Sequence, residues 1–204
     1  MSYKNETLPL VILGAGGHAS VLVDILLSKS RQIKCFIASG ETPDWVSQLG
    51  IDYYSDDGFI FDQNPSEVRL VNGLGMTNTD GKRRDLYTYY SDAGYIFPTV
   101  IAKSAVISST AVVREGAQIL HGSILNNNTF IGTNSIINTG TTIDHHTSVQ
   151  SHCHIAPGST ICGAVKVGND SFLGAGCTIV NNINLSANSF VKAGSVITES
   201  TGGN

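Results

Sequence analysis

The second half of this 204-residue chain carries an aliphatic residue at every sixth position. An α-helix would need a period near 3.6 residues, and a single strand would need a period of 2. A period of six predicts instead a chain that turns a corner every six residues, so that three flat sides make one coil of about 18 residues. The 17 positions in phase are Ile101, Ile107, Val113, Ile119, Leu125, Ile131, Ile137, Ile143, Val149, Ile155, Ile161, Val167, Leu173, Ile179, Leu185, Val191 and Ile197.

A mostly small residue lies two positions before each later aliphatic residue. We expect the aliphatic side chain to fill the interior of the coil and the small residue to fit at the crowded corner. Parallel coils would pair their backbones with the coils above and below, which explains how a segment rich in Asn and Gly becomes ordered. The small positions are Ala105, Ala111, Ala117, Ser123, Thr129, Ser135, Thr141, Thr147, Cys153, Ser159, Val165, Ser171, Cys177, Ile183, Ser189 and Ser195.

The first half predicts a small α/β unit with a parallel sheet. An apolar strand, Leu8–Leu13, precedes the glycine turn Gly14–Ala19, and a helix follows that is capped near Ser20. Further strands are predicted over 32–38 and 67–75, and a second helix over 79–94. We therefore divide the chain into a Rossmann-like βαβ domain, residues 1–96, and a coiled domain, residues 97–204.

Composition excludes several classes of partner. The net charge is −4, with no basic stripe, so nucleic acid is not an expected partner. The apolar run Leu8–Leu13 is too short to span a membrane, and we expect a cytoplasmic protein. The four cysteines form neither a CxxC pair nor a compact disulfide framework, which predicts reduced thiols.

The glycine turn has the form of a dinucleotide-binding motif. Gly14-x-Gly16-x-x-Ala19 follows a strand and precedes a helix, so its N–H groups would receive a pyrophosphate. The ligand could be NAD, with Glu41 as the acidic partner. Another nucleotide-linked ligand, or a purely structural turn, fits the same pattern. His18 lies where its side chain could donate to a phosphate or a sugar hydroxyl.

Four of the six histidines lie between residues 145 and 154. None of them occupies an aliphatic or small position of the repeat, so none has to fill the interior. A zinc site would need three or four converging ligands, as in the β-helical hydrolases of the γ-carbonic-anhydrase type, and their ligand spacing is not found here. Proton transfer suits a histidine better, and Asp144 could support such a base.

Nearly the whole chain resembles the PglD/NeuD family of sugar acyltransferases. The motifs that carry the resemblance are "GAGGHASV" near the N-terminus, "VNGLG" at 71–75, and "IINTGTTIDHHTSVQSHCHIAPGSTICGAVKVGNDSFLGAGCTI". The repeat by itself resembles the left-handed parallel β-helix of the hexapeptide-repeat proteins. The family resemblance implies a nucleotide-sugar-binding domain, a trimeric β-helix, and an acetyl-CoA site between neighbouring subunits.

The resemblance also implies roles for particular residues. The family's catalytic base matches His145, and a histidine expected near the acetyl-CoA thioester matches His154. Backbone positions of the CoA cleft match Ala175 and Ala193. The residues that match the nucleotide-sugar site are Gly16, Gly17, His18 and Gly75.

Three departures from the family pattern are visible. His146 replaces the acidic residue that usually follows the base. Asp144 or a residue from another subunit would then support the base, or the base would act alone, and His146 itself is a second candidate for support. The chain has Ala38 and Ser39 in place of an Asp pair, and it ends in "VITESTGGN" without the usual GxPAK-like tail. The Lys82–Arg84 run is interpreted as the solvated start of a helix, with a phosphate clamp as the alternative.

The reaction expected from the resemblance is acetyl transfer from acetyl-CoA to the amine of a UDP-like nucleotide-linked 4-amino-4,6-dideoxy sugar, for surface glycan biosynthesis. No metal is expected. The alternative is O-acetylation of sialic acid or a related sugar hydroxyl. A non-catalytic trimeric scaffold and a zinc lyase are the remaining hypotheses.

Overall fold

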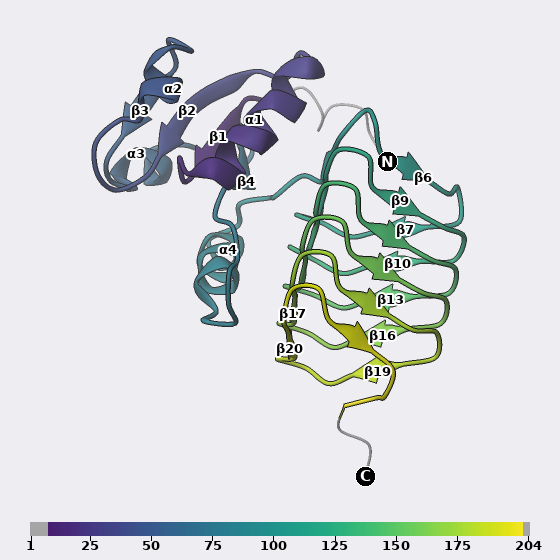
Figure 1. Cartoon of the computed structure of the whole chain (residues 1–204). Helices are drawn as coiled ribbons and strands as arrows, with labels where there is room; N and C mark the ends of the chain where they lie inside the picture. Colours follow the sequence, from purple (N-terminus) through teal and green to yellow (C-terminus); the bar gives the residue numbers. More distant parts are fainter. Residues whose placement is uncertain (1–7, 202–204) are drawn as a thin grey trace. The chain divides into compact units, whose positions relative to one another are not determined.

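The computed structural model of the chain describes residues 8–201, and they divide into two compact units (Figure 1). One unit contains the residues up to Gly75 together with Asp85–Pro98. The other contains Met76–Arg84 and the residues from Thr99 onward. The boundary predicted between residues 96 and 97 would place Met76–Arg84 in the first domain instead. Over residues 8–201, no helix is both long and apolar enough to cross a membrane.

The first unit is built around a four-stranded parallel sheet in the order β3-β2-β1-β4. Its central strands are buried on both faces, which explains why Leu10–Leu13 carries no polar residue. The last helix begins at Lys82, so its first turn groups with the second unit. The elements are β1 (Leu10–Leu13), α1 (Gly17–Ser28), β2 (Ile33–Ile37), α2 (Asp44–Ser47), β3 (Asp52–Tyr54), α3 (Gly58–Phe61), β4 (Arg69–Asn72) and α4 (Lys82–Asp92).

The predicted α/β pattern is confirmed, with two differences. The first helix begins at Gly17, and its N-cap is Gly16, which has no side-chain cap. Ser20 was predicted as the cap, but its hydroxyl donates to the Gly17 carbonyl inside the first turn. The sequence pattern also missed β3, α2 and α3, because elements of three or four residues are too short to show a period.

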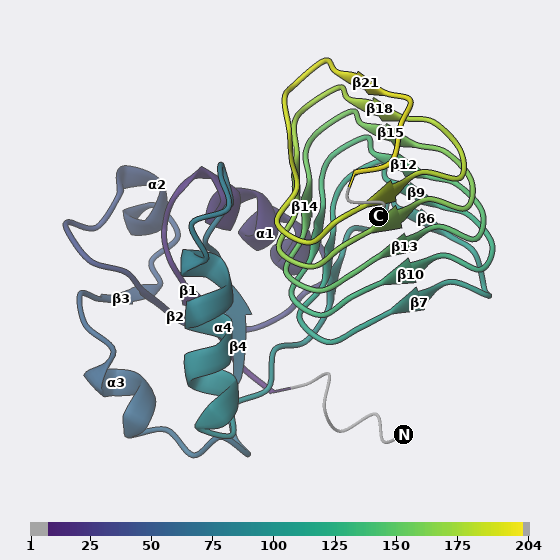
Figure 2. The same cartoon turned by 90° about the horizontal axis from the view of Figure 1, so that it is seen from below.

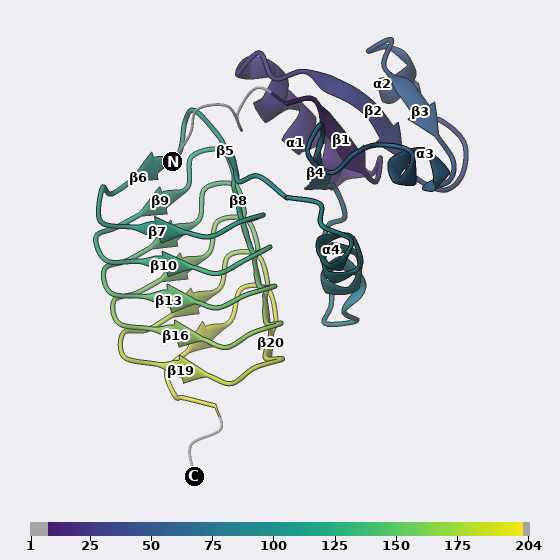
Figure 3. The same ribbon diagram turned by 180° about the vertical axis from the view of Figure 1, so that it is seen from behind.

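The second unit is a left-handed parallel β-helix of 17 two-residue strands (Figure 3). Each strand ends at one of the predicted aliphatic residues, so the six-residue repeat is confirmed throughout. The strands are β5 (Val100–Ile101), β6 (Val106–Ile107), β7 (Val112–Val113), β8 (Gln118–Ile119), β9 (Ile124–Leu125), β10 (Phe130–Ile131), β11 (Ile136–Ile137), β12 (Thr142–Ile143), β13 (Ser148–Val149), β14 (His154–Ile155), β15 (Thr160–Ile161), β16 (Lys166–Val167), β17 (Phe172–Leu173), β18 (Thr178–Ile179), β19 (Asn184–Leu185), β20 (Phe190–Val191) and β21 (Val196–Ile197).

Every third strand lies in the same sheet, so the β-helix has three sides. One sheet runs from β5 to β20 through β14, the second from β6 to β21 through β12, and the third from β7 to β19 through β13. Figure 2 shows β14, β12 and β13 on these three sides. Phe130 pairs with Ser148 and Ile143 with Ile161, which is one coil of 18 residues along the chain. Residues 18 positions apart are therefore neighbours on adjacent coils.

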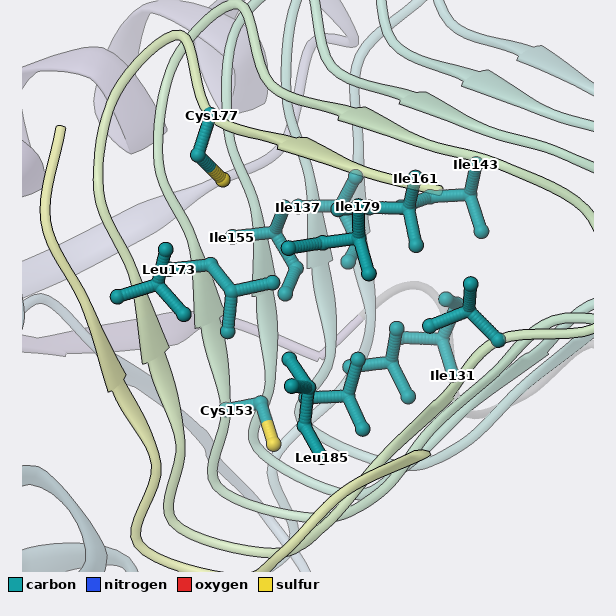
Figure 4. Close-up of a cluster of buried hydrophobic side chains, with 14 of the residues drawn as sticks. Ile131, Ile137, Ile143, Cys153, Ile155, Ile161, Leu173, Cys177, Ile179 and Leu185 are labelled. Carbon is teal, nitrogen blue, oxygen red and sulfur yellow. The ribbon is translucent and has the colours of Figure 1, made fainter. Parts of the chain in front are cut away.

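Aliphatic side chains fill the interior, as Figure 4 shows for Ile143, Ile161 and Ile179. Most of the small positions are equally buried, and several of their hydroxyls bond to backbone carbonyls of the next coil. Thr147 donates to the Cys162 carbonyl at 2.7 Å, and Ser135 donates to the Gln150 carbonyl at 2.8 Å. These bonds satisfy polar groups that would otherwise be costly to bury. All four cysteines are free.

From Gly116 onward, each corner between two sheets contains one residue with positive φ. In one column of corners that residue is glycine, for example Gly140 and Gly158. In the other two columns it is often Asn, Asp or His, the non-glycine types that tolerate the left-handed region best. His146 (φ 59°) and His152 (φ 60°) both occupy such positions. Their place in the sequence thus has a backbone explanation that is independent of catalysis.

Candidate functional site

Asp144, His145 and His146 lie together on the corner that joins β12 to β13. The His145 side chain is 53% exposed, so its ring is open to a substrate. Its Nδ1 lies 3.1 Å from Nδ1 of His146, and the two rings meet edge to face at 5.3 Å. The geometry therefore brings the predicted base together with both residues that the sequence suggested as its support.

Asp144 is held in place from two directions. Its Oδ1 accepts hydrogen bonds from the His145 backbone N–H at 2.7 Å and from the Asn126 amide at 2.8 Å. These two bonds, in that order, lower the pKa of the carboxyl group and keep it ionised. Its Oδ2 lies 3.9 Å from Nε2 of His145, close enough to stabilise a positive charge on that ring.

Gly163 lies one coil beyond His145 and was missed by the sequence analysis. A Cβ on Gly163 would lie 2.6 Å from Cε1 and 2.8 Å from Nε2 of His145. The absence of a side chain there leaves the space that the imidazole occupies. The signal that could have found Gly163, and Asn126 on the preceding coil, is the 18-residue spacing itself.

His154 lies on a different side of the β-helix, in β14, and is only 7% exposed. Its Nδ1 donates to the Met76 carbonyl at 2.7 Å, and its Nε2 accepts from the Asn138 amide at 3.0 Å. Burial lowers the pKa of His154 to about 4, so the ring is neutral at physiological pH. The described contacts of His154 are thus structural, and its predicted contact with acetyl-CoA stays a prediction.

Ala175 and Ala193 are exposed and stack on adjacent coils at the corners that join the sheet of β14 to the sheet of β12. The Gly194 N–H donates to the Ala175 carbonyl at 2.9 Å. A Cβ on Gly174 would lie 2.4 Å from the Ala193 nitrogen, so this column of corners depends on small residues. This column of corners presents backbone and methyl groups at one edge of the β12 sheet, and the His145 corner lies at the opposite edge.

The glycine turn in the α/β unit opens at the N-terminus of α1. Gly16 and Gly17 are exposed, and a Cβ on either would meet nothing within 4 Å. His18 is half-buried and packs beside Gly75, where a Cβ would lie 3.3 Å from the His18 Cβ. The four residues predicted for nucleotide-sugar binding are therefore brought together at the N-terminus of α1, where the first N–H groups of a helix have no partner inside it.

The Lys82–Arg84 run begins helix α4, as predicted, but not all of its side chains are exposed to solvent. Arg83 is 4% exposed, and its Nε donates to the Asn134 carbonyl at 3.3 Å. Arg84 forms an ion pair with Asp170 at 3.1 Å. These two arginines fasten Met76–Arg84 to the β-helix. Over residues 8–201, no three His, Cys, Asp or Glu side chains are grouped so that they could hold a metal ion.

Comparison with protein families matches two overlapping parts of the β-helix. The family described as "Bacterial transferase hexapeptide (six repeats)" matches residues 146–181. "Hexapeptide repeat of succinyl-transferase" matches residues 164–199. No curated protein matches the chain.

Solved structures match nearly the whole chain. A histidine-to-asparagine variant of perosamine N-acetyltransferase from Caulobacter crescentus, in complex with CoA and GDP-perosamine, is 29% identical. The match covers 94% of this chain and 89% of that one, with a TM-score of 0.85. The acetyltransferase domain of PglB from Neisseria gonorrhoeae is 21% identical over 94% of this chain and 92% of its own, with a TM-score of 0.84, and supports the fold.

Proposed function

Because this chain belongs to the hexapeptide-repeat sugar acyltransferases of the left-handed β-helix superfamily, we propose that it is an acetyl-CoA-dependent sugar N-acetyltransferase. Its substrate is the amine of a nucleotide-linked 4-amino-4,6-dideoxy sugar, and its product serves surface glycan biosynthesis. The Caulobacter crescentus relative, which was solved with CoA and GDP-perosamine, supports a nucleotide sugar as acceptor. The nucleotide of this chain's substrate is proposed to be of the UDP type, and a GDP carrier is the comparison to test.

His145 is the proposed general base. The amine nitrogen attacks the thioester carbonyl carbon, a C–N bond forms, and the C–S bond breaks as the CoA thiolate leaves. The amine must lose one proton in this sequence, and Nε2 of His145 takes it. The same proton then returns to the thiolate. The observation that carries this assignment is the exposed His145 ring, which is held between Asp144 and His146 and fills no interior position.

Asp144 supports the base electrostatically. The imidazolium that forms during the reaction places a positive charge near the Asp144 carboxylate, whose Oδ2 lies 3.9 Å from Nε2. The bonds from the His145 N–H and the Asn126 amide keep that carboxylate ionised and oriented. Asp144 thus takes the supporting role at a position before the base rather than after it.

The remaining predicted residues are proposed as binding residues. Gly16, Gly17, His18 and Gly75 receive the nucleotide, with the pyrophosphate at the N-terminus of α1. Ala175 and Ala193 line the CoA site, and His154 is proposed to act there as a neutral side chain. We also propose a homotrimer with active sites between subunits, because His145 and His154 lie on different sides of one β-helix.

The first experiment measures thiol release from acetyl-CoA with UDP-linked and GDP-linked 4-amino-4,6-dideoxy sugars. Release that depends on the sugar, with a product heavier by one acetyl group, supports N-acetyl transfer and identifies the nucleotide. Release only with sialic acid or another hydroxyl acceptor would assign O-acetylation instead. No release with any acceptor, in protein that remains folded, would favour the scaffold or lyase hypotheses.

A further inference from the structure

We propose that Asn128 is a positioning residue that sets, through His146, which ring nitrogen of His145 carries the proton. This inference rests on the proposed function, in which His145 is the base. It assigns a role to a residue that neither the repeat nor the family resemblance singled out. It also explains how a histidine can serve where the family usually has a carboxylate.

The three side chains form one hydrogen-bonded chain across two coils. Asn128 and His146 are 18 residues apart, at equivalent corner positions with φ of 57° and 59°. The Asn128 Nδ2 lies 3.2 Å from the His146 Nε2, and the His146 Nδ1 lies 3.1 Å from the His145 Nδ1. Asn128 is anchored in turn, because its backbone N–H donates to the Thr110 hydroxyl at 2.9 Å.

The donors and acceptors along this chain determine where each proton lies. An amide nitrogen only donates, so the His146 Nε2 accepts from Asn128. A neutral His146 then carries its proton on Nδ1 and donates to the His145 Nδ1. A neutral His145 must therefore carry its own proton on Nε2, the nitrogen that lies 3.9 Å from the Asp144 Oδ2. In this arrangement the Nε2 of His145 has no lone pair for a substrate.

Rotation of the Asn128 amide by about 180° reverses the whole chain, since a primary amide presents an acceptor in place of a donor. The His146 Nε2–H then donates to the Asn128 Oδ1, and the His145 Nδ1–H donates to the His146 Nδ1. One proton shifts from His146 to His145 along the hydrogen bond between their Nδ1 atoms. The His146 Nε2 gains a proton from water and the His145 Nε2 loses one, so the total is unchanged.

The reversed arrangement is the active one. The lone pair of the His145 Nε2 is now available to the substrate amine, while its Nδ1–H is held by a neutral acceptor. When Nε2 takes the proton, the positive charge faces the Asp144 carboxylate, and no further proton has to move. His146 supplies orientation and Asp144 supplies charge, two roles that one carboxylate would combine.

Two substitutions of Asn128 test this proposal. Asn128→Gly keeps the backbone conformation, because glycine adopts positive φ freely, but it removes the amide. Asn128→Asp supplies a group that only accepts and therefore favours the active arrangement. We expect Asn128→Gly to lower kcat about tenfold, as for the loss of one hydrogen bond to a catalytic unit. Asn128→Asp should recover turnover relative to Asn128→Gly.

The matched control is Asn182→Gly, which changes the same residue type at the same kind of corner, with φ of 64°. Its kcat should equal that of the wild type. The direct readout is the ring ¹⁵N spectrum of histidine-labelled protein, which distinguishes Nδ1–H from Nε2–H in His145 and His146. Asn128→Asp should move both rings to the active arrangement, with His146 protonated on Nε2 and His145 on Nδ1.

Tautomers that are identical in wild type, Asn128→Gly and Asn128→Asp would overturn the proposal, whatever the activities. If the tautomers change in Asn128→Gly but its kcat equals that of the wild type, the hydrogen-bonded chain from Asn128 to His145 has no role in catalysis. If His145→Ala keeps full activity, the proposed base is wrong, but the ring spectra still decide whether Asn128 controls the two histidines. The two failures are therefore distinguishable.

Discussion

In the α/β unit the proposed nucleotide site is made mostly of glycine backbone, together with the His18 side chain, whereas in the β-helix the proposed catalytic site is made of side chains. Gly16 and Gly17 present N–H groups at the start of α1, with open space where a side chain would lie. The corner of His145 instead depends on side chains from neighbouring coils, such as Asn126 and Asn128. A stacked fold can thus assemble a site from residues 18 positions apart, whereas a strand–turn–helix unit concentrates it in one short motif.

The largest expected effect is on catalysis in the β-helix. His145→Ala should lower kcat about 10²- to 10⁴-fold, the usual contribution of a general base, and leave the fold intact because the ring is half exposed. Thiol release and circular dichroism together measure this. His152→Asn is the control, since it keeps a residue that tolerates the positive φ of that corner. Near-full activity in His145→Ala would remove this residue from the mechanism.

Two glycines of the β-helix should separate catalysis from stability. In Gly163→Ala the new Cβ collides with the half-exposed His145 ring, so kcat should fall about tenfold or more with little loss of stability. In Gly132→Ala the Cβ would lie 2.5 Å from the backbone of Gln150 and Ser151. That variant should lose roughly 1–3 kcal/mol of stability, as for other overpacked sites.

Thermal unfolding and steady-state kinetics on both variants check this contrast. A Gly163→Ala variant that loses stability but keeps the kcat of the wild type would mean that Gly163 serves packing alone. The same measurements on Gly132→Ala show how large a purely structural effect is in this fold.

The stability of the β-helix should fall in mild acid because of His154. Burial lowers its pKa to about 4 in the folded chain, against about 6.5 when unfolded. Between these values the unfolded chain binds a proton that the folded chain does not, so acid favours unfolding. The contribution of His154 to the free energy of unfolding is complete above about pH 6.5 and is lost by about pH 4. It amounts to a total on the order of 3 kcal/mol.

Denaturant unfolding at several pH values measures this slope. The polar groups that face His154 are the Met76 carbonyl, the Asn138 amide and Arg83, whose charge further disfavours protonation, and the Phe172 ring packs edge to face against it. His154→Leu is the comparison, because a buried apolar residue does not titrate. Equal slopes between pH 4 and 6.5 in both proteins would contradict the assignment of this pH dependence to His154.

The smallest expected effect is in the α/β unit and tests its backbone site. Gly17→Ala should leave stability unchanged, since its Cβ meets nothing within 4 Å, but the methyl group would obstruct a phosphate at the helix N-terminus. We expect KM for the nucleotide sugar to rise about tenfold, while KM for acetyl-CoA stays constant. Ser28→Ala, at the other end of α1, is the control. An unchanged KM for the sugar in Gly17→Ala would show that the turn is architectural.

The β-helix shows how far a sequence can predict a structure. All 17 strands follow from the spacing of the aliphatic residues, because a coil that repeats every 18 residues buries the same positions in every turn. The same register placed His145 outside the interior. The α/β unit was predicted less completely, since β3, α2 and α3 are shorter than the window in which a period is visible.

The site was predicted as a set of residues but not as a set of contacts. Asp144 and His146 were named as possible support for His145, although neighbours on an extended chain tend to point apart, and Asn126, Asn128 and Gly163 were not identified. They contact Asp144, His146 and His145 only because stacking of coils turns a separation of 18 residues into direct contact.

The sequence by itself determined the coiled architecture, the open glycine turn and the exposure of His145, because each depends on a local pattern or a strict repeat. Only the tertiary structure decided that His154 is buried. Its Nδ1 donates to the carbonyl of Met76, in the segment Met76–Arg84, which lies earlier in the chain than the first coil. Arg83 and Arg84 hold that segment to the β-helix through Asn134 and Asp170. No periodic pattern encodes such a contact, because it joins segments about 80 residues apart through individual polar groups.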